Sequence, residues 1–148
     1  MLKNVMKVFI SHSYKNESLA QKIAEILKKA GLDVWDGREI LPGDNWADKV
    51  SHALNESDAM VVLLTSDSLK SRSVRHEIEF ALGEKRFRRR LIPVLVGSPD
   101  KFSGEDFPWI LNHLKTVKLT ESENNEEDLK QITQALFEDS SDTATTKS

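Results

Sequence analysis

The chain has 148 residues, of which 30% are charged, and a formal net charge of −3 at pH 7. This length predicts one domain with a sizeable core, and this charge gives no sign of a nucleic-acid-binding surface. There is no cysteine, which excludes disulfides, thiolate zinc sites and cysteine nucleophiles. No signal peptide is apparent, and no apolar run approaches the roughly 20 residues that a membrane helix needs. We therefore expect a cytoplasmic protein that binds neither nucleic acid nor membrane.

The first part of the chain predicts a strand, a helix and a second strand. Residues 5–11 (VMKVFIS) are mostly apolar and β-rich, as in a strand covered on both faces. After a polar turn, Asn16 can cap a helix over residues 17–30, and Gly31 marks the end of that helix. Residues 32–35 (LDVW) form a short second strand.

A loop then leads into a second helix. Residues 36–45 (DGREILPGDN) contain a turn signal at Pro42 and Gly43, because proline presets φ and glycine accepts a positive φ. The second helix begins at Trp46, and residues 60–64 form a third strand.

The third helix covers residue 71 to about residue 85 and carries the most informative side chain. Its apolar residues repeat at i, i+4, i+7 and i+8, which defines one face: Val74, Ile78, Ala81 and Leu82. Glu77 lies on the border of that face, about one turn into the helix. Because the helix follows a strand directly, this carboxylate lies where open α/β sheets bind ligands.

The next elements alternate in the same way. Residues 91–96 (LIPVLV) predict a fourth strand, in which Pro93 indicates one unpaired position near an edge or a bulge. Residues 97–108 form a loop, residues 109–114 a short helix and residues 115–119 a last short strand.

The C-terminal part predicts one more helix and a tail. Residues 128–137 show helical apolar spacing, whereas residues 138–148 (EDSSDTATTKS) have almost nothing to bury and predict a disordered tail. The domain therefore covers residues 1–137, with its core at about 6–119.

The alternation of strands and helices predicts the architecture. It is typical of a three-layer α/β fold with about five parallel strands and helices on both faces. Right-handed crossovers place the loops that follow the strands on one edge of the sheet. Three of these loops, at 12–16, 36–45 and 65–73, would surround the start of the Glu77 helix.

Four segments in this order resemble a Toll/interleukin receptor (TIR) domain of the bacterial kind. They are residues 7–13 (KVFISHS), 32–46 (LDVWDGREILPGDNW), 58–82 (DAMVVLLTSDSLKSRSVRHEIEFAL) and 88–96 (RRRLIPVLV). The resemblance implies a flavodoxin-like fold. Many bacterial and plant members cleave NAD+ between nicotinamide and ribose, giving ADP-ribose or cyclic isomers that signal in antiphage defence. Many animal members are instead adaptors that assemble without catalysis.

The resemblance also implies a catalytic residue. Enzymatic members carry a glutamate on the third helix in a motif close to S-x-W-C-x-x-E. Ser71 and Glu77 match this motif at its spacing, whereas Ser73 and Val74 replace the tryptophan and the cysteine. Since nicotinamide departs as a neutral molecule, no general acid is required, and one carboxylate can suffice where a glycosidase uses two. The alternative is a solvent-facing helix glutamate, which most glutamates are.

Other residues are candidates for binding NAD+, which would be the substrate and not a cofactor. The turn after the first strand can hold phosphate or ribose, loop charges can line the entrance, and an arginine can meet the diphosphate. Each role has a structural alternative: ordinary turn chemistry for the residues after the first strand, and solvation for the loop charges. For Trp46 the alternative is core packing, which the sequence favours. The candidates are Ser11, His12, Ser13, Asp36, Arg38, Trp46, Ser71 and Arg75.

Two further kinds of site find little support. The four histidines show no metal-ligand spacing, so we expect no metal. The run 86–90 (RFRRR) resembles a nucleic-acid patch, but a solvated helix end whose cations complement the helix dipole is the better interpretation.

A competing hypothesis is a non-enzymatic interaction module. Ile40 and Leu41 would form an exposed apolar tip before the rigid turn at Pro42 and Gly43, and in the family this loop mediates assembly. Self-association through TIR–TIR contacts is compatible with catalysis, because in many members a neighbouring molecule completes the active site. A separate sensor or effector protein would then be a further partner.

A third hypothesis, a receiver module, is weaker. Receivers need an acidic cluster after the first strand, where this chain has Ser11, His12 and Ser13. For the enzyme hypothesis, the choice between hydrolysis and cyclisation stays open.

Overall fold

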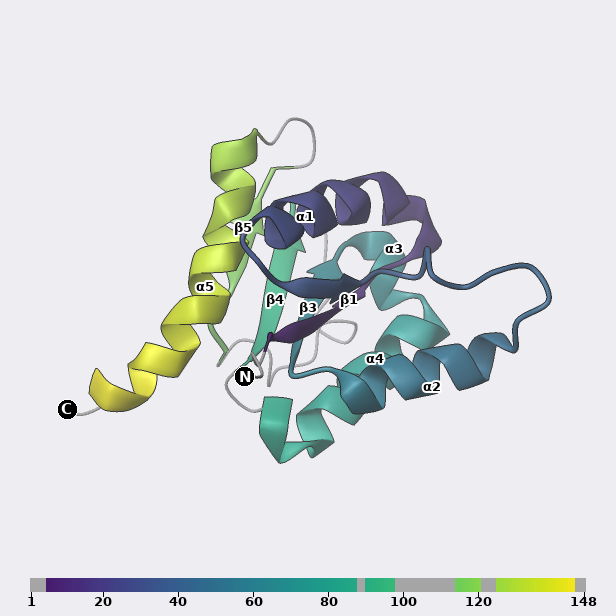
Figure 1. Cartoon of the computed structure of the whole chain (residues 1–148). Coiled ribbons are helices and arrows are strands. Elements are labelled where there is room, and N and C mark those ends of the chain that lie inside the picture. Colours follow the sequence, from purple (N-terminus) through teal and green to yellow (C-terminus); the bar gives the residue numbers. More distant parts are fainter. Residues whose placement is uncertain (1–4, 88–89, 98–113, 121–124, 146–148) are drawn as a thin grey trace.

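A five-stranded parallel sheet forms the centre of the molecule (Figure 1). The structure is a computed structural model that describes residues 5–87, 90–97, 114–120 and 125–145. The strand order is β2-β1-β3-β4-β5, which is the order of flavodoxin-like sheets and confirms the predicted fold class. The strands are β1 (Lys7–Ser11), β2 (Asp33–Trp35), β3 (Ala59–Leu64), β4 (Leu91–Val96) and β5 (Val117–Leu119).

Helices cover both faces of the sheet, as Figure 1 shows. Helices α1 (Glu17–Lys29) and α5 (Glu126–Thr145) pack on one face, and α2 (Trp46–Glu56) and α4 (Arg72–Gly83) pack on the other. Three short helical turns complete the connections: η1 (Tyr14–Asn16), α3 (Ser66–Leu69) and η2 (Lys85–Phe87).

Strand β3 joins the two halves of the core. All six of its residues are buried, and successive side chains enter opposite layers. Val61 and Leu63 pack with α1 and α5, whereas Met60, Val62 and Leu64 pack with α2 and α4. Because both faces of β3 are covered, its sequence is continuously apolar, as expected for a parallel strand.

Helix α4 is fixed against this sheet by its predicted apolar face. Val74, Ile78 and Ala81 are buried, whereas Leu82, which was predicted on the same face, is 41% exposed. Ser71 caps the helix, because its side chain accepts a hydrogen bond from the backbone N–H of Val74. The orientation of every other side chain on α4 follows from this docking.

Pro93 lies in an interior strand, which differs from the predicted edge or bulge. It pairs in register with Val62 of β3, and pairing with β5 begins one residue later, at Val94. The backbone N–H of Met60 bonds to the carbonyl of Arg90, so alternation along the ladder turns the Pro93 nitrogen toward β5. Proline is tolerated because its missing N–H falls where the β5 ladder starts.

The C-terminal helix is longer than predicted. Helix α5 begins at Glu126 and continues through Thr145, where a disordered tail had been expected from residue 138. Each residue added to an existing helix gains a backbone hydrogen bond, so a helix can extend without an apolar pattern in its sequence. The predicted helix at 109–114 and most of the predicted loop at 97–108 lie outside the described residues.

None of the helices in the described part of the chain is long and apolar enough to cross a membrane.

We expect Leu63→Ala to lower the free energy of unfolding by about 2–5 kcal/mol, because the side chain is fully buried and its removal leaves a cavity. Urea unfolding measures this loss. Lys118→Ala, at an exposed position of β5, is the control and should change the free energy by less than about 0.5 kcal/mol. Equal effects of the two substitutions would contradict the assigned core.

Candidate functional site

A pocket of about 340 Å³ opens at the carboxyl edge of the sheet. Its walls come from the end of β1, the loop after β2 and the first turns of α2 and α4, as the strand order predicts. The lining residues are Phe9, Ile10, His12, Tyr14, Glu17, Trp35, Asp36, Gly37, Ile40, Trp46, Val50, Ser71, Ser73 and Glu77.

Glu77 is the buried carboxylate of this pocket. Its exposed fraction is 8%, so it is more deeply buried than the predicted border position implied. The hydroxyl of Ser11, at the end of β1, donates a 2.6 Å hydrogen bond to Oε1 of Glu77. The docking of α4 therefore directs Glu77 at the strand that carries Ser11.

Burial changes the chemistry of this carboxylate. It raises the pKa of Glu77 from an ordinary 4.5 to about 7, and the Ser11 hydrogen bond and the charge of His12 offset part of this rise. Near neutral pH the group can therefore exist in either state, which is typical of carboxylates at functional sites.

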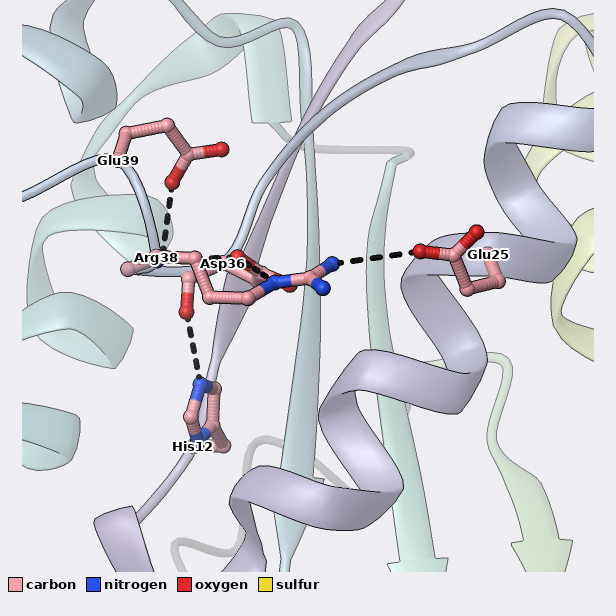
Figure 2. Close-up of polar contacts among 6 residues, drawn as sticks. His12, Glu25, Asp36, Arg38 and Glu39 are labelled. Atoms are coloured by element: carbon pink, nitrogen blue, oxygen red, sulfur yellow. Dashed lines mark hydrogen bonds and ion pairs between the residues drawn. The ribbon is translucent and has the colours of Figure 1, made fainter.

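His12 lies beside Glu77 but uses both ring nitrogens within the protein. Its Nδ1 is 2.9 Å from the carbonyl oxygen of Ser13. Its Nε2 is 3.0 Å from the carbonyl oxygen of Asp36, the contact that Figure 2 shows. The ring therefore connects the turn after β1 to the loop after β2, and its nitrogens are engaged before any ligand arrives.

Asp36 and Arg38 form an ion pair within the same loop, and Arg38 connects this loop to α1 through Glu25. Arg38 Nε lies 2.9 Å and Nη2 lies 2.8 Å from Oδ2 of Asp36, and Nη2 also lies 3.6 Å from Glu25 on α1 (Figure 2). The hydrogen bond to Asp36 raises the pKa of Arg38 above its ordinary value. Asp36 lines the pocket, whereas Arg38 is not among the lining residues and extends toward α1.

Two further predicted residues are also engaged elsewhere. Nε of Arg75 donates a 2.7 Å hydrogen bond to the carbonyl of Leu69 at the end of α3. The Ser13 side chain caps η1 by accepting from the backbone N–H of Lys15. The structure therefore brings together Glu77, Ser11, His12, Asp36, Trp46 and Ser71, but not Arg38, Arg75 or the Ser13 hydroxyl.

Trp46 stands at the rim of the pocket with an exposed fraction of 52%. The core-packing interpretation favoured by its sequence context is therefore wrong. Asn45 caps α2 by accepting from the N–H of Asp48, which makes Trp46 the first helical residue and leaves its ring at an open helix end.

Several lining residues were not predicted. The rings of Phe9 and Trp35 stack with centroids 4.8 Å apart, and both line the pocket. Tyr14, with an exposed fraction of 79%, and Glu17 come from the turn after β1 and the start of α1. Their position directly after a strand end was the one signal that pointed to them.

The loop tip divides into a buried and an exposed part. Ile40, predicted to be exposed, is half-buried against the α2–α4 layer and lines the pocket. Leu41 has an exposed fraction of 62% and follows the prediction. Pro42 and Gly43 form the predicted turn, with a φ of +91° at Gly43.

A model of the TIR domain family matches residues 8–133. The chain belongs to the TIR domain family. The match covers the sheet except for Lys7, together with the pocket described above, and it confirms the resemblance seen in the sequence.

Three relatives place this TIR domain among known proteins. The probable 2' cyclic ADP-D-ribose synthase TcpO of Methanobrevibacter olleyae is 28% identical over 131 residues, which are 84% of this chain and 38% of the relative. The metazoan TIR-STING receptor from C. gigas, solved in complex with 2',3'-cGAMP, is 26% identical, with a TM-score of 0.69 over 89% of this chain and 41% of that one. The TIR domain of the Toll-related receptor TRR-2 from Hydra magnipapillata is 20% identical, with a TM-score of 0.63 over 89% of this chain and 95% of that one, and it shares the fold. This TIR domain covers less than half of the length of the first two relatives.

We expect Glu77→Gln to stabilise the TIR domain at pH 8 but not at pH 4. In the wild type, the folded state favours protonated Glu77, and this contribution to the free energy of unfolding is complete below pH 4.5. It is lost as the pH rises to about 7, because the folded state must then bury a charge. At about 1.36 kcal/mol per pKa unit, the gain at pH 8 approaches about 3 kcal/mol.

Urea unfolding at the two pH values measures this gain, with Glu79→Gln, an exposed position on the same helix, as the control. A gain of the same size at pH 4 and pH 8 would contradict the assigned burial of charge.

Proposed function

We propose that this TIR domain is an NAD+ nucleosidase that cleaves the bond between nicotinamide and ribose, with Glu77 as the catalytic residue. The observation that carries this proposal is the buried Glu77 carboxylate, which is bonded to Ser11 and lines a pocket at the carboxyl edge of the sheet. The family match and the named activity of the Methanobrevibacter olleyae relative support it.

The reaction suits a single carboxylate. When the bond between C1' and the ring nitrogen breaks, its electron pair goes to nicotinamide, which leaves neutral, and positive charge develops on the ribose. Ionised Glu77 stabilises this positive charge. The interaction is strong because Glu77 is buried in the wall of the pocket, where little water screens its charge. Water or a hydroxyl of the nucleotide then bonds to C1' and gives up its proton.

The character of the pocket supports a cationic substrate ring. Three carboxylates contribute to its lining, at Glu17, Asp36 and Glu77. Trp46 presents an aromatic face at the rim, on which a positively charged nicotinamide ring can stack. Ser71 offers a hydroxyl for the ribose, while it also caps α4.

The proposed products are nicotinamide and either ADP-ribose or a cyclic ADP-ribose isomer. The name of the Methanobrevibacter olleyae relative supports the cyclic product. The proposed role is antiphage signalling, which the TIR resemblance implies.

A second proposal is self-association through the loop tip, with or without catalysis. Leu41 is a large apolar side chain with an exposed fraction of 62% at the tip of a loop that lines the pocket through Ile40. A neighbouring molecule that covers Leu41 would therefore lie next to the site.

We expect Glu77→Gln to lower the rate of nicotinamide release by at least about 100-fold, because glutamine keeps the size of the side chain and removes the charge that the transition state needs. Chromatography of purified protein incubated with NAD+ measures the release and identifies the second product. The control is Glu79→Gln, which should keep the wild-type rate. If Glu77→Gln and the wild type release nicotinamide equally fast, Glu77 is not catalytic.

The pH dependence gives a second measurement of the same group. Because the ionised carboxylate is the active form, kcat/KM should rise with pH through about 7. An activity that has already reached its plateau at pH 5 would contradict this role.

For self-association, we expect Leu41→Asp to remove the increase in mass with concentration that light scattering detects for the wild type. A charge at the tip cannot be buried in an apolar contact without a large desolvation cost. Leu82→Asp, an exposed leucine on α4, is the matched control and should still associate. A wild type that stays monomeric at every concentration, with and without NAD+, would refute this proposal.

A further inference from the structure

The ring of His12 lies between two hydrogen-bond acceptors. Its two nitrogens are 2.9 and 3.0 Å from the carbonyl oxygens of Ser13 and Asp36. A carbonyl oxygen accepts and never donates, and a neutral imidazole has one N–H and one lone pair. A neutral ring would therefore leave one of these contacts between two lone pairs. Both contacts become hydrogen bonds when both nitrogens carry protons.

We propose that His12 is a positioning residue that acts as a doubly protonated imidazolium, holding the loop after β2 against the pocket and supplying a positive charge that favours the ionised form of Glu77. This inference rests on the proposed function, and it assigns His12 a role through two backbone carbonyls and not through contact with the substrate.

The first part of the role concerns the wall of the pocket. The carbonyl that Nε2 faces belongs to Asp36, and the chain turns directly after it, at Gly37, with a φ of +100°. Gly37 and Ile40, the next parts of this loop, line the pocket. The loop is held on its other side by Arg38, which pairs with Asp36 within the loop and with Glu25 on α1 (Figure 2). Loss of the His12 contact would leave this wall with one anchor in place of two.

The second part of the role concerns charge. Among the lining residues that the structure describes, His12 is the one that can carry a positive charge. The other titratable residues that line the same pocket are Glu77 from α4, Glu17 from α1, Tyr14 from η1 and Asp36 from the loop after β2.

Asp36 and Glu77 are the buried acids of the described residues, and the carboxylate of Asp36 is already paired with Arg38. For Glu77, the neighbouring charge that acts on the carboxylate is that of His12. The charge of His12 lowers the pKa of Glu77 and so opposes the effect of burial.

The second role has a consequence for the pH dependence of the proposed reaction. Glu77 must lose its proton to be active, which sets the rising limb. Removal of the His12 cation should therefore move the rising limb to higher pH, whereas loss of packing alone would lower activity without moving it.

The decisive test needs no substrate and no variant. Nitrogen-15 NMR of the ligand-free full chain at pH 7 distinguishes a doubly protonated histidine from a neutral tautomer. We expect both His12 nitrogens to give protonated shifts in the folded protein. A neutral tautomer for His12 at this pH would overturn the proposal.

A second measurement uses His12→Gln, with His52→Gln as the matched control. His52 lies on the exposed part of α2 and contacts Glu56. Carbon-13 NMR titration of the Glu77 carboxyl should show its midpoint moving up by on the order of one pH unit in His12→Gln and staying in place in His52→Gln. An unmoved midpoint in folded His12→Gln would overturn the electrostatic role.

The two NMR results also separate this inference from the proposed function. If the wild type releases no nicotinamide from NAD+ but His12 is doubly protonated and its removal raises the Glu77 midpoint, the enzymatic proposal fails while the positioning role stands. If nicotinamide release depends on Glu77 but its rising limb is the same in His12→Gln and wild type, the enzymatic proposal stands and the role of His12 fails.

Discussion

The burial of the Glu77 carboxylate is the constraint on which the rest of the site depends. A carboxylate taken out of water favours its neutral form, and here burial outweighs one hydroxyl hydrogen bond and one neighbouring cation. The folded state holds the group there because Val74 and Ile78 dock α4 on the sheet and Ser11 ends the strand beneath it. A group that costs stability when ionised is typical of a functional site.

The geometry of the site therefore depends directly on the sheet. The residues that contact the carboxylate or lie beside it come from the end of β1, which is paired on both sides, by β2 and by β3. His12 continues from that strand end to the carbonyl of Asp36, and Arg38 continues to α1 (Figure 2). A movement of the loop after β2 would therefore move the ring of His12, which contacts the backbone of that loop and lies beside Glu77. Leu41, exposed on the same loop, is where the proposed self-association would act next to the proposed active site.

Local patterns predicted the elements well where burial has a period. The continuous apolar strand at 59–64 and the spacing of Val74, Ile78 and Ala81 led to the correct element types within two or three residues. The position of Trp46 was misjudged because the sequence around it would have the same pattern in the core and at the rim of a pocket. The position of Pro93 was misjudged because an apolar strand has the same pattern at the edge and in the interior of a sheet. The length of α5 was missed because helix extension past residue 137 needs no apolar pattern.

The sequence by itself determined the α/β alternation and the edge of the sheet at which Glu77 would lie, since these follow from side-chain period and from the handedness of crossovers. The resemblance to TIR domains made Glu77 the catalytic candidate. Only the tertiary structure decided which neighbours the carboxylate has. Ser11 is 66 positions away in the chain, and the ring of His12 reaches a carbonyl 24 positions away. Such contacts depend on strand register and helix docking to within an ångström, and no local pattern of residues encodes a distance of that kind.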